Sequence, residues 1–171
     1  MLAVSNSSPL IYLAKGKLLF CLKEVFEKVY ICEGVYQETV VAGIAKGYED
    51  AKVIEKAVKD WIELRRVHLD LFAWLASRVG EGRLEDIRKL FKRLSKVDVE
   101  TVTLAVEVGA DYLLLDDRAA IKAARAIQEQ TSFALLGTGD VIERALETHI
   151  ISKAEYVNFL KSFGEAIAWV E

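Results

Sequence analysis

Apolar residues recur along the chain in two patterns, short continuous runs and longer stretches with helical spacing. Continuous apolar runs are typical of strands buried on both faces of a parallel sheet, and they predict strands at 2–5, 29–32, 62–67, 112–115 and 132–136. Between them, apolar residues recur at intervals of three and four, the spacing of amphipathic helices. Strands that alternate with helices predict an α/β fold: a single three-layer domain with a central, mainly parallel sheet flanked by helices.

Some of the predicted helices carry local start signals. Ser8 before Pro9 has the form of an N-cap followed by proline at the first helical position. Ser152 and Glu155 have the spacing of a capping box, which predicts where the last helix begins. Residues 97–108 are apolar nearly all round, which favours a helix that is buried on most sides.

The 171 residues have the length of one domain, and we expect residues 1–171 to form a single one. Within it, residues 69–96 are predicted to form a helical insertion and residues 152–166 a C-terminal helix. The spaced glycine pairs at 80 and 82 and at 137 and 139 do not complete a G-x-G-x-x-G phosphate-binding motif. We therefore interpret both pairs as marks of helix ends.

The composition narrows the class of protein. Hydrophobic residues make up 53% of the chain and there is one proline, which excludes a disordered chain and a loop-rich all-β domain. No apolar run approaches the roughly 18 residues that span a membrane, so we expect a soluble, cytoplasmic protein without membrane contact. Cys21 and Cys32 lack the spacing of a zinc site and are expected to be reduced. Because the net charge is -3, any contact with nucleic acid must come from a local basic patch.

Polar and acidic residues follow the predicted strands, whose carboxyl ends meet at one edge of a parallel sheet. They are Asn6 after the first strand, Glu38 on the helix after the second, Asp116 and Asp117 after the strand at 112–115, and Asp98 and Glu100 at the start of the buried helix. Carboxylates gathered at one edge are tolerated only with a compensating cation. Because all these donors are oxygens, Mg²⁺ or Mn²⁺ is expected rather than Zn²⁺. Such a metal suits phosphodiester hydrolysis, which makes a nuclease the natural enzyme hypothesis.

Five segments of the chain, taken in order, resemble PIN-domain proteins. Residues 4–11 (Val-Ser-Asn-Ser-Ser-Pro-Leu-Ile) resemble the N-terminal signature of the branch with the pattern (D/N)-x-S-P-L-I. Residues 35–40 resemble the family's V-x-x-E-V helix, and residues 98–105 resemble its G-E-x-E-A-I-x-L-A segment. Residues 109–118 resemble G-A-D-x-L-L-x-D-D-R, and residues 136–139 resemble a later G-T-x-G stretch. The resemblance as a whole spans residues 1 to about 160. The five segments in this order are more specific to the family than any one of them alone.

The resemblance implies a metal-dependent ribonuclease, often the toxin of a VapBC-type toxin–antitoxin pair. It implies that Glu38, Glu100 and Asp117 hold the metal, with Asp98 and Asp116 as further ligands or helpers. Asn6 completes the catalytic set with Glu38, Glu100 and Asp117, at a position where the family usually has Asp. Because Asn offers a neutral carbonyl oxygen in place of a charged carboxylate, metal affinity is expected to fall.

Basic residues supply candidate contacts to RNA. Arg118, Lys122 and Arg125 recur at helical spacing directly after the paired aspartates, and with Ser7 they are the predicted RNA-binding residues. A second basic stripe lies within residues 83–96. This stripe either contacts RNA or forms a solvated face that pairs with acidic residues of its own helix.

The expected partners are an RNA substrate, a small antitoxin protein and a second copy of the chain. Phe159, Leu160, Phe163 and Trp169 near the C-terminus either build a homodimer interface or close the core of one molecule.

The sequence is compatible with three functions. The first is a Mg²⁺- or Mn²⁺-dependent ribonuclease acting on single-stranded or looped RNA, whose backbone enters a shallow cleft more easily than a stiff duplex does. The second is a catalytically impaired PIN-like module that binds RNA or a protein through the same groove. The third is a nucleotide-binding α/β protein without nuclease activity.

Overall fold

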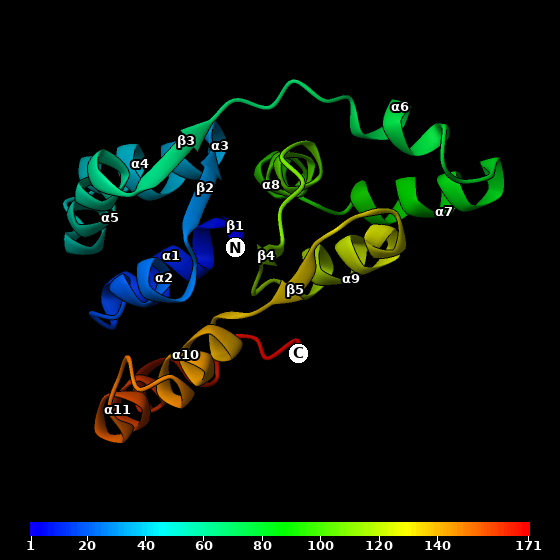
Figure 1. Cartoon of the computed structure of the whole chain (residues 1–171). Coiled ribbons are helices and arrows are strands. Elements are labelled where there is room, and N and C mark those ends of the chain that lie inside the picture. Colours follow the sequence, from blue (N-terminus) through cyan, green and yellow to red (C-terminus); the bar gives the residue numbers. More distant parts are fainter.

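A five-stranded sheet forms the centre of the protein. In the computed structural model, which describes residues 1–171, all five strands are parallel and lie between two layers of helices (Figure 1). The strands are β1 (Leu2–Ser5), β2 (Lys28–Cys32), β3 (Ile62–Arg65), β4 (Tyr112–Leu114) and β5 (Ala134–Leu136), in the order β3-β2-β1-β4-β5. The predicted α/β fold is confirmed. The strands predicted at 62–67 and 132–136 are each two residues shorter than expected.

The order of the strands reverses between β1 and β4. After β1 the chain adds β2 and β3 on one side, whereas β5 lies beyond β4 on the other side. β1 and β4 pair directly, with Ser5 opposite Leu114. In open parallel sheets, ligands bind outside the carboxyl ends of the strands at such a switch point. The residues that directly follow β1 and β4 therefore mark the place for a candidate site.

Helices cover both faces of the sheet (Figure 1). One layer consists of α1 (Ser7–Lys15), α2 (Phe20–Val25), α5 (Glu49–Asp60) and α10 (Thr138–Glu147), with α11 (Lys153–Phe163) packed against α10. The other layer consists of α8 (Lys96–Glu107) and α9 (Arg118–Ile127), with α7 (Glu81–Phe91) packed on α9 and α6 (Leu71–Ala76) on α7. After β2 the chain runs through α3 (Glu33–Tyr36), a π-helical turn (Gln37–Val41) and α4 (Ala42–Ala45), and a short 3-10 turn (Gln128–Gln130) follows α9.

The first helix begins two residues earlier than the sequence predicts. α1 starts at Ser7, so Asn6 occupies the N-cap position and Pro9 stands in the first turn. Proline is tolerated there because the N–H groups of the first turn have no partner within the helix. Asn6 makes no side-chain bond to the helix that it precedes. Its side-chain amide instead bonds to residues of α8.

Helices lie within both regions for which the sequence predicts them, and the last one, α11, ends at Phe163 rather than at residue 166. Residues 69–96 hold α6 and α7, which project beyond the edge of the sheet in Figure 1. At the start of α11, Ser152 Oγ accepts the Glu155 N–H at 3.2 Å, and Glu155 Oε2 accepts the Ser152 N–H at 2.7 Å. The capping box predicted there is confirmed. None of the helices combines the length and the apolar character that crossing a membrane requires.

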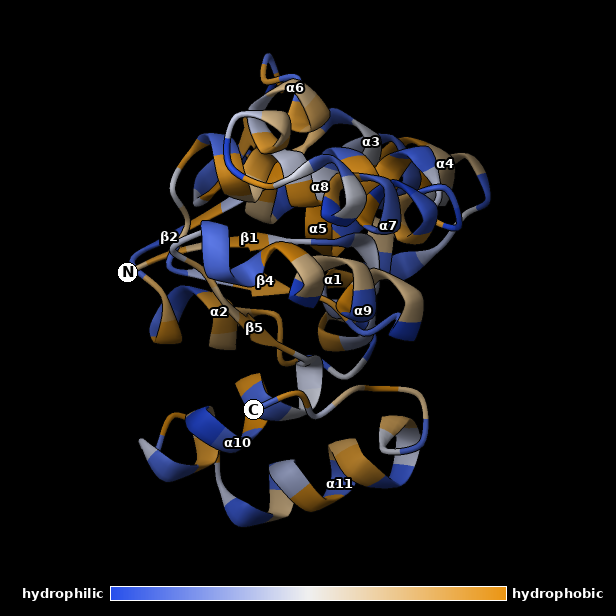
Figure 2. Ribbon diagram, turned by 90° about the vertical axis from the view of Figure 1, so that its right-hand side faces the viewer, coloured by the Kyte–Doolittle hydropathy of each residue, from blue (hydrophilic) through white to orange (hydrophobic).

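The hydrophobic core follows the central strands and the inner faces of the helices. It comprises 44 buried residues, among them Leu113, Leu114 and Leu115 with no exposed surface. In Figure 2 the central strands are mostly coloured hydrophobic, whereas the outer helices show both colours. Residues 101–105 of α8 are consecutively buried, which confirms the prediction of a helix covered on most sides.

The C-terminal aromatic residues divide between the core and the surface. Phe159 is 3% exposed and packs over Gly16, where an added Cβ would lie 2.4 Å from its ring. The ring of Phe163 lies beside it, with 5.0 Å between the ring centroids. Trp169, in contrast, is 44% exposed. Phe159 therefore closes the core of one molecule, whereas Trp169 lies on the surface.

Candidate active site

Asn6 lies at the switch point, directly after β1, and its side chain is only 5% exposed. Its backbone N–H donates to Leu114 O of β4 at 3.1 Å. Its side-chain Nδ2 donates to Asp98 Oδ1 at 2.7 Å, and its Oδ1 accepts from Thr101 Oγ1 at 3.3 Å. Both polar atoms of the amide therefore bind α8, and Asn6 joins the end of β1 to the first turns of that helix.

Asp98 is held from two sides. Its Oδ2 accepts the backbone N–H of Ser95 at 3.4 Å, as the second half of the capping box that starts α8, while its Oδ1 accepts from Asn6. The capping box fixes the first turn of the helix, and the Asn6 amide fixes the carboxylate against the sheet edge. Asp98 is thus a positioned carboxylate at the carboxyl end of β1.

Glu38 and Glu100 approach the same edge from the neighbouring elements. Glu38 lies in the π-helical turn after β2, and its Oε2 accepts from Ser7 Oγ at 2.5 Å. π-Helical turns are rare and occur often at functional sites. Glu100 Oε2 on α8 lies so close to the start of α3 that a Cβ on Gly34 would meet it at 2.8 Å. α3 and α8 therefore approach each other closely at Gly34.

Asp117 is the exposed residue that caps α9. Its Oδ2 accepts the backbone N–H of Ala120 at 2.9 Å, which is the ordinary N-cap bond of Asp. The other carboxylate oxygen, Oδ1, makes no hydrogen bond to the protein. Asp117 therefore combines a structural role in the helix with a free oxygen at the carboxyl end of β4.

Asp116, although adjacent in sequence, faces a different set of partners. Its Oδ1 accepts the backbone N–H groups of Thr138 at 2.9 Å and of Ala168 at 2.8 Å, and its Oδ2 accepts the Thr138 hydroxyl at 2.7 Å. Burial raises the pKa of the Asp116 carboxyl, an effect that these hydrogen bonds reduce and nearby Asp140 increases. Both of its oxygens are thus engaged in holding β5, α10 and the C-terminal segment together.

Asp140 is a buried carboxylate that sequence reasoning did not single out. It is 3% exposed, and its Oδ2 accepts the backbone N–H groups of Gly137 at 2.6 Å and Val170 at 2.8 Å. Its Oδ1 accepts from Glu171 N at 3.3 Å. The only sequence signal is its place three residues after Gly137, the N3 position of α10. With Asp116, it fixes residues 168–171 against the sheet.

The raised pKa of Asp116 gives a signed prediction for stability. A carboxyl whose pKa is higher in the folded than in the unfolded chain stabilises the fold below its unfolded pKa, and this stabilisation is lost as pH rises through the folded pKa. Asp116→Asn keeps an acceptor for the two N–H groups but cannot ionise. We expect denaturant unfolding between pH 7 and pH 3.5 to show wild-type stability increasing relative to that of the variant as pH falls.

Asp116→Ala is the control for the clamp itself. It leaves buried N–H groups without an acceptor and is expected to cost about 1–3 kcal/mol at any pH in this range. If wild type and Asp116→Asn change in parallel with pH, the carboxyl does not ionise with a raised pKa and the explanation is wrong.

The donor chemistry fits a hard divalent cation. Glu38, Asp98, Glu100 and Asp117 form no ion pair with Lys or Arg, and the hydrogen-bond donors to their carboxylates are a hydroxyl, an amide and backbone N–H groups. The set offers only oxygens, as Mg²⁺ and Mn²⁺ prefer. The histidines and cysteines contribute nothing to it. Cys21 and Cys32 are free and buried, and burial raises the pKa of the Cys32 thiol.

The arrangement differs from a ready-formed metal cluster. No three Asp, Glu, His or Cys side chains lie close enough together to hold a metal ion between them. Like charges repel one another, and Glu38, Asp98 and Asp117 each accept from separate neutral donors instead. The carboxylates share one edge of the sheet but do not converge on one point.

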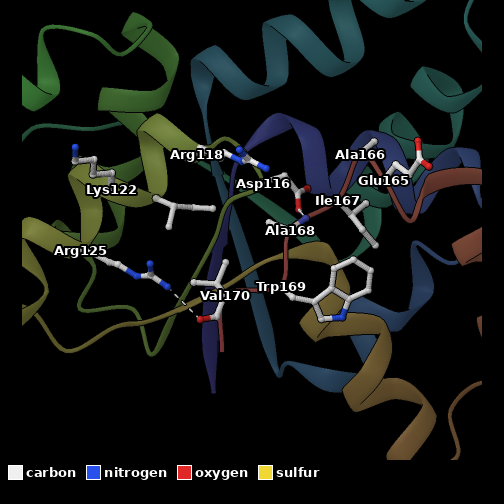
Figure 3. A pocket seen from close by; sticks show the side chains of 11 residues that line it. Asp116, Arg118, Lys122, Arg125, Glu165, Ala166, Ile167, Ala168, Trp169 and Val170 are labelled. Atoms are coloured by element: carbon white, nitrogen blue, oxygen red, sulfur yellow. Dashed lines mark hydrogen bonds between the residues drawn. The ribbon is translucent and has the colours of Figure 1, made fainter.

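The predicted RNA-contacting residues begin at the same edge, where Ser7 starts α1 and Arg118 starts α9. Arg118, Lys122 and Arg125 are exposed on one side of α9 and line a pocket beside Asp116 (Figure 3). Ser7 is buried and donates to Glu38, so the structure places it as a support for that carboxylate.

Comparison with known families agrees with this architecture. The family model DUF3368, described as a PIN domain, matches residues 2–170, nearly the whole chain. The chain therefore belongs to the PIN-domain family, a class with a nuclease-type fold. Searches of curated proteins and of solved structures gave no match to the chain.

Proposed function

We propose that this protein is a Mg²⁺- or Mn²⁺-dependent ribonuclease that hydrolyses phosphodiester bonds of RNA. The observation that carries the proposal is that Glu38, Asp98, Glu100 and Asp117 lie along the carboxyl edge of the sheet without any cationic partner. Unpaired carboxylates are costly to collect at one edge, and a divalent metal is the partner that compensates them there. Membership of the PIN-domain family supports the same chemistry.

Each side chain has a separate role in this proposal. Glu38, Glu100 and Asp117 would hold the metal, which when bound activates water and neutralises charge that develops on the phosphate. Asp98 assists them and is oriented by the Asn6 amide, while Ser7 orients Glu38. Asp116 is a positioning residue that fixes the C-terminal segment and the start of α10 beside the site.

Asn6 favours a second candidate, a PIN-like module that binds RNA or a protein without cleaving it. Its amide nitrogen donates to Asp98 and its oxygen already accepts from Thr101, so Asn6 offers a metal only the second lone pair of a neutral oxygen. A carboxylate at this position would add a charged ligand, and its absence weakens metal binding. The same edge would then serve recognition alone.

A nucleotide-binding role finds less support in the glycines at 137 and 139. An added Cβ on Gly137 would lie 2.0 Å from Ala168 O, and one on Gly139 would lie 2.3 Å from the Trp169 ring. These glycines make room for the chain's own C-terminal segment. They leave no backbone cradle of the kind that holds a phosphate.

The biological setting remains part of the proposal. We propose in addition that the protein is a toxin that pairs with a small antitoxin protein and acts in the cytoplasm as a homodimer. A gene for a small protein directly beside the gene for this chain would add support for the toxin role.

The proposal is tested with purified protein, labelled single-stranded RNA of mixed sequence and a titration of Mn²⁺. We expect cleavage to increase with Mn²⁺ and to stop with EDTA, and the same RNA in a duplex to be cut more slowly. RNA binding without cleavage at any Mn²⁺ concentration would favour the binding module. If the protein binds neither RNA nor Mn²⁺, only the nucleotide-binding hypothesis remains.

A further inference from the structure

A groove lies beside the carboxylates, between α9 and the C-terminal segment. Its volume is about 610 Å³, and Figure 3 shows the basic side chains of α9 along one wall. The opposite wall is formed by residues 165–170, which include Trp169. Asp116, at the carboxyl end of β4 and next to Asp117 in the chain, lines the groove as well, so one end of the groove lies at the same edge of the sheet.

The basic wall is available to bind an anion. Arg118, Lys122 and Arg125 are exposed, and none of them forms an ion pair with a carboxylate. Arg125 donates from Nη2 to Val170 O at 3.2 Å, which orients it toward the C-terminal segment. Seven residues of helix separate the first cation from the last, about 10 Å along the axis. This row can therefore contact successive phosphates of one strand.

Two acidic residues also line the groove. Asp116 already accepts three hydrogen bonds from the protein, and Glu165 lies on the opposite wall (Figure 3). A polyanion would therefore bind along α9 rather than along the C-terminal segment. The bases of that strand would then face the wall formed by residues 165–170.

Trp169 is an exposed aromatic ring on an anchored backbone. It is 44% exposed, and one part of its ring rests on Gly139. Its neighbours fix the chain on both sides, since Ala168 N donates to Asp116 at 2.8 Å and Val170 N donates to Asp140 at 2.8 Å. An anchored aromatic ring beside a basic row has the character of the stacking platforms that bind unpaired bases.

We propose that this groove binds the single-stranded RNA that flanks the site of cleavage, with the α9 cations on its phosphates and Trp169 stacked against a base. The inference rests on the proposed function, because it places the substrate of that same site. Bases of a duplex are already stacked on one another, so Trp169 selects an unpaired strand. The groove thereby gives the enzyme its preference for single-stranded RNA.

The test measures binding in EDTA, where cleavage is absent, by fluorescence polarisation of a labelled single-stranded RNA. Trp169→Leu is expected to weaken binding roughly tenfold, whereas Trp169→Phe retains most of it because a ring remains. The combined substitution Arg118→Ala, Lys122→Ala and Arg125→Ala is expected to weaken binding more and to reduce the salt slope by about 2. Lys89→Ala, Lys92→Ala and Arg93→Ala, which remove three exposed cations at the end of α7 and in the turn after it, form the matched control and are expected to change binding little.

The outcomes separate this inference from the proposed function. Wild-type binding that is lost in the α9 and Trp169→Leu variants supports the groove, even if Mn²⁺ never produces cleavage. Cleavage by the wild type with unchanged RNA affinity in both groove variants overturns the groove and leaves the ribonuclease intact. If only the α7 control loses RNA affinity, the RNA binds the other basic face and the inference is wrong. The inference is also wrong if the wild type does not bind the RNA at all. Circular dichroism checks that each variant is folded.

Discussion

Asp117→Asn is expected to lower metal-dependent RNA cleavage roughly 100-fold or more while leaving the protein folded. The substitution removes one charged ligand of the proposed metal, and even residues that only orient metal ligands cost 10- to 100-fold when they are changed. Asn is as good an N-cap as Asp, so the bond to Ala120 N is retained. The loss of negative charge at the start of α9 costs only about 0.5 kcal/mol. Initial rates of cleavage with saturating Mn²⁺ and thermal unfolding measure the two effects.

Asp70→Asn is the matched control for this experiment. Asp70 caps α6 in the same way, with Oδ1 accepting the Ala73 N–H at 3.1 Å, and it lies outside the candidate site. The same chemical change at an equivalent cap is expected to leave the rate of cleavage unchanged. Full cleavage by the Asp117→Asn protein would exclude this carboxylate as a metal ligand.

Asn6→Asp is expected to destabilise the metal-free protein and to strengthen metal binding. The amide that donates to Asp98 at 2.7 Å would be replaced by a second carboxylate at the same place. The loss of a hydrogen bond to a charged group and the repulsion that follows cost about 2 kcal/mol at neutral pH. For a chain of this length, that is a decrease in Tm of about 4–8 °C in EDTA. Addition of Mn²⁺ is expected to restore stability and to raise cleavage above the wild-type rate.

A double variant isolates the contact. Asn6→Asp combined with Asp98→Asn exchanges the two side chains and restores a carboxylate–amide hydrogen bond without the repulsion. Its Tm in EDTA is expected to lie closer to the wild type than that of Asn6→Asp alone. Equal Tm values for Asn6→Asp and wild type would show that Asn6 and Asp98 are not in contact in solution.

The sheet and the edge that carries the site could be predicted because they depend on local patterns. Continuous apolar runs such as 112–115 predict buried strands, and parallel strands bring their carboxyl ends to one edge whatever their order. The strand order itself was not predicted. It is the order that identifies Asn6 and Asp117 as residues of the switch point, since β1 and β4 are neighbours only in the folded chain.

Asp116 and Asp117 are adjacent in the sequence, which gives no sign that their roles in the structure differ. Asp117 caps the following helix, whereas Asp116 accepts N–H groups from residues 22 and 52 positions away. Backbone N–H groups are present in every residue except proline and leave no trace in the sequence. Asp140 was missed for the same reason, because its partners are backbone groups of a C-terminal segment without periodicity.

The pairing of β1 with β4 also bears on how the protein is made. Residues 2–5 must find residues 112–114, a contact that closes a loop of about 110 residues and is formed late compared with local structure. Asn6 and Glu38 belong to the part of the chain that is synthesised early, whereas Glu100 and Asp117 are added much later. A growing polypeptide on the ribosome therefore carries only Glu38 of the four carboxylates until translation passes residue 97, and Asp117 is added when about two-thirds of the chain has been made. Whatever this edge does to RNA, it cannot do before most of the chain has been synthesised.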